Sequence, residues 1–258
     1  MFGIVHVPLA PLREAPSAGA VMISQLIAGE MVEILDAEHS LFLVMNRYDG
    51  LKGWVDPRMV EVLLEGQDNK IDKSVLGIVP APLLCAKDQY GRSFYLPGGS
   101  RIYSHGSSVA VAPCRNLEKE VVKELAQPKF KHHEQLIRTA MAYNGAPFLP
   151  GGKSVFGIDC TGLVQIVCQL NGLEMPRDIK QQLEVGEVVG HIEEARPGDL
   201  AFFEDTDGNI LHNGWLMDGG RVVHSDGEVR VDMLDHEGIF NKQTRQYSHK
   251  LKVIKRII

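Results

Sequence analysis

Hydrophobic residues in the first quarter of the chain come in short runs that turn residues separate. Residues 21–35 (VMISQLIAGEMVEIL) cluster apolar side chains around Gly29-Glu30, and residues 41–55 (LFLVMNRYDGLKGWV) read as two strands joined by Asp49-Gly50. An Asp-Gly pair between two apolar runs is a strong hairpin signal. Short strands with turn residues at such intervals are typical of a small barrel, so the pattern predicts a β-barrel over residues 1–64.

The next segment combines β-type and helical patterns. The polar run 65–73 (EGQDNKIDK) predicts a linker, and residues 74–88 and 91–113 carry short β-type runs between Pro and Gly. Residues 116–144 have helical composition, which Pro128 divides into two helices. We therefore expect a second small β-module with a linker helix over residues 65–125.

The last part of the chain is organised differently. A helix and a Gly-rich loop lead to an apolar run with helical spacing in residues 157–172 (GIDCTGLVQIVCQLNG), and β-rich runs bounded by Gly and Asp follow. Helices followed by a meander of strands indicate an α+β domain over residues 126–258. The expected fold class is thus multidomain, with two small β-barrels ahead of an α+β domain.

Cys160 stands between an acid and a threonine, where a loop turns into a helix. Unpaired backbone N–H groups and the positive end of the helix dipole favour thiolate over thiol at such a position. Cysteine is also often a small buried hydrophobe, and Cys168, two turns further along among valines, is expected to be core. The local pattern at residue 160 therefore allows either a nucleophile or a packing residue.

A thiolate nucleophile needs a base and a group that orients this base. His212 and His224 stand on consecutive strand candidates, six residues on either side of Asp218, with a Gly-Gly turn between them. Residues placed symmetrically about a turn face each other across an antiparallel pair. The pattern predicts a chain from Cys160 to His212 to His224; the alternative is that both histidines are ordinary polar strand residues.

Three segments resemble the signatures of the NlpC family of papain-like cysteine peptidases. They are residues 145–164 (GAPFLPGGKSVFGIDCTGLV), 196–205 (RPGDLAFFED) and 211–226 (LHNGWLMDGGRVVHSD). The resemblance implies an NlpC-type catalytic domain with Cys160 as nucleophile, His212 as general base and His224 as the orienting third member. It also places Asp159 in the substrate subsite and Thr161 where the family usually has Ser.

The sequence departs from the family pattern at three positions near this site. Phe148 stands where the family commonly has Tyr, so the backbone N–H of Cys160 must carry more of the oxyanion stabilisation. Pro150 replaces a frequent aromatic residue, and Asn213 follows the expected base where Val is usual. These departures affect the expected shape and lining of the substrate pocket more than the expected reaction.

The front half narrows the resemblance. Residues 48–55 (YDGLKGWV) resemble the end of a bacterial SH3-like domain, so both predicted barrels read as SH3-like modules. With Asp159 they resemble a cytoplasmic branch of the family that recycles cell-wall peptides by cleaving the γ-D-Glu–diamino acid bond after a free N-terminal L-Ala. Asp159, Tyr48 and Glu14 would then share the substrate ammonium, because a buried ammonium without partners is costly. The alternative for Tyr48 is a hairpin residue packed on Trp54.

Composition excludes several other classes of function. The chain of 258 residues has a net charge of -6 and no long Lys/Arg block, so no nucleic-acid partner is expected. It lacks a run of about 18 apolar residues, and its N-terminus has no basic n-region, so we expect neither a membrane span nor a signal peptide, and a cytoplasmic location. A chain from which a leader had been removed would read the same.

The cysteines and histidines form no metal-binding pattern. The four cysteines include no CxxC pair, no HExxH is present, and the adjacent pair His132-His133 does not share a helix face. We expect neither a metal nor another cofactor; the oligomeric state stays open.

Three hypotheses about function remain at this point. The first is a cysteine peptidase acting on small murein peptides. The second is a broader murein endopeptidase outside the cell, and the third is an inactive SH3-like peptide-binding protein.

Overall fold

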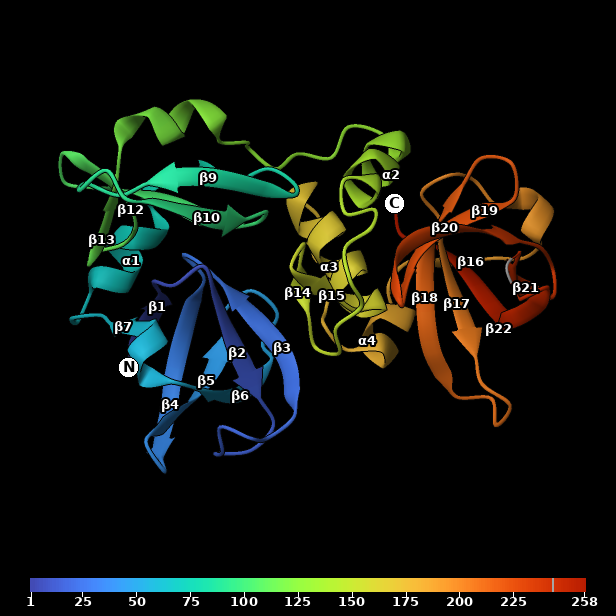
Figure 1. Ribbon diagram of the computed structural model, residues 1–258, viewed down its shortest axis with the longest axis horizontal. Coiled ribbons are helices and arrows are strands. Elements are labelled where there is room, and N and C mark those ends of the chain that lie inside the picture. Colours follow the sequence, from blue (N-terminus) through green and yellow to red (C-terminus); the bar gives the residue numbers. More distant parts are fainter. Residues whose placement is uncertain (243) are drawn as a thin grey trace. The chain divides into compact units, whose positions relative to one another are not determined.

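The computed structural model describes residues 1–242 and 244–258, which form two compact units (Figure 1). Unit 1 comprises residues 1–128 and 150–155, and unit 2 comprises residues 129–149 and 156–258. The chain thus leaves unit 2 after Leu149, contributes six residues to unit 1 and returns at Phe156. No helix in the described ranges is both long enough and apolar enough to cross a membrane.

Unit 1 begins with a seven-stranded antiparallel sheet in the order β3-β2-β6-β5-β4-β1-β7. The Asp49-Gly50 hairpin is confirmed, because the strands on either side of it pair and Gly50 takes a left-handed φ of 71°. Buried Val, Leu and Ala side chains fill the core of this sheet. The elements are β1 (Phe2–Val5), β2 (Leu9–Arg13), β3 (Met22–Ile27), β4 (Met31–Glu38), β5 (Leu41–Asn46), β6 (Lys52–Val55), the 3-10 turn η1 (Pro57–Met59) and β7 (Val60–Val62).

The rest of unit 1 contains a four-stranded sheet, β13-β12-β11-β8, and the two-stranded pair β10-β9. Its elements are α1 (Gln67–Asp72), β8 (Val75–Ile78), β9 (Leu83–Lys87), β10 (Ser93–Pro97), β11 (Arg101–His105), β12 (Ser108–Ala112), β13 (Arg115–Leu117) and the 3-10 helix η2 (Lys119–Glu124).

Two expectations for this region are wrong. The polar run 65–73 forms helix α1 rather than a plain linker, because Ile71 anchors it in a core cluster with Ile4 and Tyr103. The helix expected ahead of Pro128 is the short 3-10 helix η2, since β13 already occupies residues 115–117. The shared cluster joins the two predicted β-modules in one unit. Their boundary at residue 64 and their SH3-like identity stay predictions.

The inserted segment 150–155 is held in unit 1 by a buried ion pair. Lys153 Nζ lies 2.8 Å from Glu30 Oε1, and the two side chains are 0% and 1% exposed. Glu30 Oε2 also accepts the Ile27 N–H, and the Lys153 N–H donates to Gln25 Oε1, each at 2.9 Å. Gly151, with φ 77°, approaches unit 1 so closely that a Cβ would fall 2.3 Å from a backbone oxygen. The segment, which includes β14 (Lys153–Ser154), is therefore fixed in place five residues before Cys160.

Unit 2 places helices first and a barrel afterwards, as the sequence predicted. Strands β22, β17, β18, β19, β20 and β21 pair in this order, and β21 pairs again with β22, which closes a six-stranded barrel with β16 at its edge (Figure 1, orange to red). The elements are α2 (His133–Met141), β15 (Gly157–Ile158), α3 (Cys160–Leu170), α4 (Ile179–Leu183), β16 (Glu187–Val189), η3 (Ile192–Glu194), β17 (Leu200–Glu204), β18 (Ile210–Met217), β19 (Arg221–Asp226), β20 (Glu228–Leu234), β21 (Gly238–Asn241) and β22 (Gln246–Arg256).

Helix α3 is the central helix of unit 2. It packs on α2, β18 and β19, and its apolar side chains from Leu163 to Cys168 are fully buried. Cys168 is among them, which confirms the expectation that this thiol belongs to the core. Residues 160–169 are all buried, so this helix is enclosed on every side and not only on one face.

Breaking the Glu30–Lys153 ion pair is expected to destabilise the protein strongly. Glu30→Gln alone or Lys153→Met alone should each lower the free energy of unfolding by about 3–5 kcal/mol, because the remaining charge stays buried without a partner. The double variant should recover most of this loss. Urea unfolding followed by circular dichroism measures the effect.

The matched control is the surface pair Asp56–Arg58 in the same unit, where the arginine side chain is 88% exposed. Arg58→Ala should cost less than about 1 kcal/mol. Single variants at residues 30 and 153 that cost no more than this control would show that the buried pair does not hold the segment.

Candidate active site

Helix α3 begins at Cys160 because Asp159 caps it. Asp159 has extended backbone angles, and its Oδ1 accepts the Gly162 N–H at 2.7 Å. Such a cap satisfies one of the free N–H groups of the first helical turn. The predicted change from loop to helix at the cysteine is confirmed.

The thiol of Cys160 lies beside the backbone of β18, where it interacts with the two residues that flank His212 in the chain. Its Sγ–H donates to the Leu211 carbonyl at 3.9 Å, and the Asn213 N–H also favours a charge on the sulfur. Burial, followed by the neighbouring charge of Asp159, nevertheless raises the pKa of Cys160 to about 11. The helix start was expected to ionise this thiol, whereas burial disfavours the thiolate and keeps the pKa above its ordinary value.

The two predicted histidines form a buried chain that ends on a carboxylate. His212 Nε2 and His224 Nδ1 lie 2.9 Å apart, and His224 Nε2 lies 3.1 Å from Asp232 Oδ2. Arg230 Nε lies 2.8 Å from the same oxygen. Although burial opposes it, hydrogen bonds from His224 and Arg230 lower the pKa of Asp232 to about 2. Asp232 is thus an ionised acceptor at neutral pH.

When both imidazoles are neutral, this carboxylate fixes the tautomer of each. An ionised carboxylate only accepts hydrogen bonds, so His224 must carry its proton on Nε2, which leaves Nδ1 as an acceptor. His212 must then carry its proton on Nε2 in order to donate to His224. The lone pair of His212 is consequently on Nδ1, and this nitrogen is the one available as a base.

The register between the strands differs from the sequence expectation. His224 stands opposite Gly214, not opposite His212, because the turn between β18 and β19 is centred on Gly219 rather than Asp218. The imidazoles meet diagonally, a separation that long side chains can bridge. A Cβ at residue 214 would lie 2.9 Å from the His224 Cβ, so the glycine leaves room for this geometry.

His249 is a neighbour of His212 that sequence reasoning missed. Its ring stacks on that of His212 with centroids 4.2 Å apart and planes 27° apart. Burial, followed by the nearby His249 and His224, lowers the pKa of His212 well below its ordinary value. The imidazole of His212 is therefore neutral at pH 7, as a base must be. No motif surrounds His249, and Asp232 carries only the weak signal of an acid in an apolar strand.

The side chains beside the nucleophile are already engaged. Arg177 donates to Asp159 Oδ2 at 2.6 Å and also to Thr161 Oγ1, and this hydroxyl donates to Asp159 Oδ1 at 3.0 Å. Gln182 Nε2 donates to the carbonyls of Thr161 and Pro176 at 3.0 and 2.8 Å. Arg177 lies in the loop 175–178 (MPRD) after the nucleophile helix, and the sequence alone did not reveal its partner. The substrate roles of Asp159 and Thr161 stay predictions.

The other two substrate candidates, Tyr48 and Glu14, lie in unit 1. The Tyr48 ring centroid is 5.8 Å from Lys153 Nζ and 5.9 Å from Arg101 Cζ, whereas Glu14 is exposed. Their part in binding stays a prediction. Phe148, the departure from the family Tyr, is 41% exposed in unit 2. Across residues 1–242 and 244–258 no group of three or more His, Cys, Asp or Glu side chains is arranged to hold a metal ion.

Comparisons with known proteins show which family and relatives this chain resembles. Residues 145–248 match the NlpC/P60 family. The γ-D-glutamyl-L-lysine dipeptidyl-peptidase of Bacillus subtilis (strain 168) is 38% identical over 94 residues, which cover 36% of this chain and 31% of that protein. Dipeptidyl-peptidase 6 of Lysinibacillus sphaericus is 25% identical over 92% of this chain and 93% of its own length. The chain therefore matches about a third of the first relative and nearly all of the second.

A solved structure extends the likeness to the whole fold. The crystal structure of an NlpC/P60 family protein from Bacillus cereus ATCC 10987 superposes with a TM-score of 0.83. The match covers 100% of this chain and 99% of that one at 19% identity. The fold of both units is thus shared with a solved protein.

Alkylation of Cys160 in the substrate-free protein should be slow at neutral pH. With a pKa of about 11, only about one thiol in ten thousand is ionised at pH 7, so the rate should rise about tenfold per pH unit up to pH 10. Peptide mass spectrometry after timed iodoacetamide treatment measures it. Cys85, which is exposed, serves as the internal reference. Faster alkylation of Cys160 than of Cys85 at pH 6 would contradict the neutral resting thiol.

Asp232 should be needed for activity although it is two hydrogen bonds away from the base. Asp232→Leu removes the acceptor that fixes His224 and should lower kcat by at least about tenfold. Asp232→Asn keeps an acceptor oxygen and should be less damaging. Steady-state kinetics at pH 7 compare the two variants, with circular dichroism to check folding. Unchanged kcat in a folded Asp232→Leu variant would remove Asp232 from the chain.

Proposed function

Because residues 145–248 form an NlpC/P60 domain, we propose that the chain is a cysteine peptidase that cleaves the γ-D-Glu–diamino acid bond of small murein peptides. The observation that carries the proposal is the chain of imidazoles. Cys160 begins a helix beside the backbone of His212, and His212 is oriented through His224 by an ionised Asp232. The names of two relatives, a γ-D-glutamyl-L-lysine dipeptidyl-peptidase and dipeptidyl-peptidase 6, support the choice of bond.

The reaction follows from the tautomers. His212 Nδ1 takes the proton of the Cys160 thiol, and the sulfur attacks the γ-glutamyl carbonyl. The Cys160 N–H at the start of α3 donates to the developing oxyanion. His212 then returns the proton to the leaving amine, and water hydrolyses the thioester with His212 again as base. Asp232 stabilises the transient imidazolium through His224.

The buried thiol determines when the proton moves. Burial raises the pKa of the Cys160 thiol and lowers the pKa of the His212 imidazole, and both shifts favour the neutral pair over the ion pair. Proton transfer is therefore coupled to substrate binding and to attack.

The proposed substrate carries a free N-terminal L-Ala, and the proposed setting is recycling of cell-wall peptides in the cytoplasm. Asp159, with Tyr48 and Glu14, is the candidate acceptor for the substrate ammonium. Asp159 also neutralises the buried guanidinium of Arg177, so its replacement would disturb the site itself. The amine specificity is best tested by changing the substrate.

Product analysis by mass spectrometry tests the proposed activity. L-Ala-γ-D-Glu-L-Lys, its diaminopimelate counterpart and the N-acetylated twin of each should be incubated with the protein. We expect release of L-Ala-γ-D-Glu from the free-amine peptides only. Cleavage of the acetylated twins would favour the broader murein endopeptidase, and no cleavage of any peptide would contradict the proposal.

The nucleophile has a matched control in the same chain. Cys160→Ala should lower turnover by about ten-thousandfold or more. Cys85→Ser, at an exposed cysteine in unit 1, should retain wild-type turnover. Dipeptide release by Cys160→Ala at the wild-type rate would exclude Cys160 as the nucleophile.

A further inference from the structure

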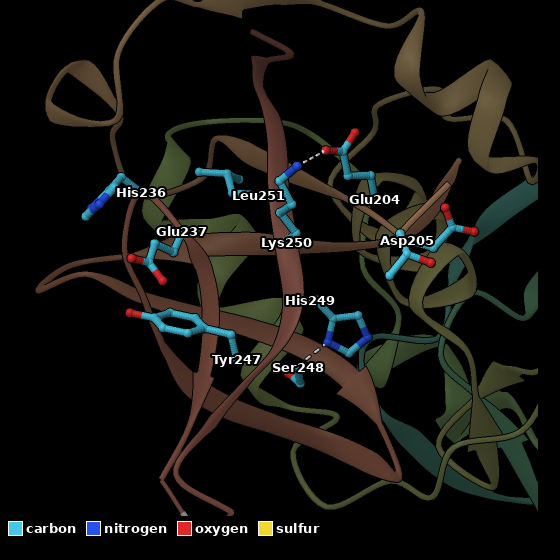
Figure 2. A pocket seen from close by; sticks show the side chains of 10 residues that line it. Glu204, Asp205, His236, Glu237, Tyr247, Ser248, His249, Lys250 and Leu251 are labelled. Atoms are coloured by element: carbon cyan, nitrogen blue, oxygen red, sulfur yellow. Dashed lines mark hydrogen bonds and ion pairs between the residues drawn. The ribbon is translucent and has the colours of Figure 1, made fainter. Parts of the chain in front are cut away.

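Unit 2 contains a cavity that the proposed mechanism does not yet use. Its volume is about 690 Å3, within the range of about 300–1000 Å3 that is usual for small-molecule pockets. Three segments line it, as Figure 2 shows: the end of β17, the loop before β21 and the first half of β22. All three belong to the barrel that carries His212 and His224.

His249 connects this cavity to the catalytic base. It lines the cavity, and its ring stacks on the His212 ring with centroids 4.2 Å apart. Its Nδ1 lies 2.9 Å from the Ser248 hydroxyl, a contact drawn in Figure 2. The His249 imidazole therefore lies between the cavity and His212, the proposed base.

The chemistry of acyl transfer determines which part of a substrate lies beside His212. The acyl part stays on the sulfur, whereas the leaving amine must receive its proton from the imidazole. The released residue therefore lies next to His212 rather than along the nucleophile helix. The cavity beyond His249 is the adjoining space within unit 2.

The charges around the cavity favour a cationic group. Glu204 pairs with both Lys250 and Lys252, whose Nζ atoms lie 2.8 and 2.7 Å from its oxygens, so these three side chains together carry one net positive charge. Asp205 and Glu237 add two further carboxylates, which Figure 2 shows on either side of the strand that carries His249. Asp205 Oδ1 accepts backbone N–H groups from its own turn, so this carboxylate is held in place.

We propose that this cavity is the subsite for the released diamino acid, whose distal ammonium lies against the carboxylate of Glu237. The inference rests on the proposed function and deepens it. It assigns the recognition of the second amine to unit 2 alone. His249 forms the wall between this subsite and the base.

The test compares two substrates that differ only at the distal amine. L-Ala-γ-D-Glu-L-Lys and L-Ala-γ-D-Glu-L-norleucine share the same acyl part and the same scissile bond. An ion pair with partly exposed carboxylates contributes up to about 1 kcal/mol, so kcat/KM should favour the lysine peptide about fivefold in the wild type.

Variants at Glu237 then connect the preference to the cavity. Glu237→Gln should bring the ratio of kcat/KM values close to one, and Glu237→Lys should reverse it. The norleucine peptide should be cleaved at the wild-type rate by Glu237→Gln, which shows that the variant is folded and that the chemistry is intact. Glu193→Gln, at an exposed glutamate of η3 outside the cavity, should keep the wild-type ratio.

The possible failures are distinguishable. A wild type that cleaves both peptides equally well, or a lysine preference that survives both Glu237→Gln and Glu237→Lys, would overturn the subsite and leave the proposed peptidase intact. Cleavage of neither peptide by the wild type would remove the proposed function, and the subsite with it.

Discussion

The hydrogen bond between His212 and His224 determines how the catalytic half of the chain can be built. It requires two neighbouring antiparallel strands, a glycine at residue 214 and a carboxylate on the next strand. Each step of the chain advances diagonally by two residues, because His224 stands opposite Gly214 and Val222 stands opposite Asp232. The row formed by His212, His224 and Asp232 thus runs diagonally across three adjacent strands. A closed barrel holds this row rigidly, since none of its six strands can shift without disturbing both neighbours.

Burial around this row determines its electrostatics. The same loss of water that makes the hydrogen bonds strong favours the neutral forms of both the Cys160 thiol and the His212 imidazole. The charges of the row are confined to its far end, where Arg230 and His224 both donate to the ionised carboxylate of Asp232. A single fixed negative charge at the far end is enough to orient both rings. The two imidazole rings are therefore held in a fixed orientation without being charged themselves.

Much of this arrangement was predictable from the sequence, and the limits have physical causes. The Asp49-Gly50 hairpin, the helix beginning at Cys160 and the helices-then-strands order follow from local turn chemistry and periodicity. Asp232, Arg177 and His249 were not found, because their roles depend on strand register and on loop contacts between residues far apart in the chain. Helix α1 was missed because a single buried isoleucine outweighs a polar run.

The buried pair of Glu30 and Lys153 has a consequence for how this architecture can evolve. The lysine stands in the loop ahead of the nucleophile, whereas its carboxylate belongs to the first sheet of unit 1. A lineage that lost or exchanged the front unit would inherit an ammonium without a counterion, and would have to replace residue 153 at the same time. Unit 1 and the loop ahead of Cys160 are therefore constrained to evolve together, and we expect residues 30 and 153 to change together among descendants of this chain.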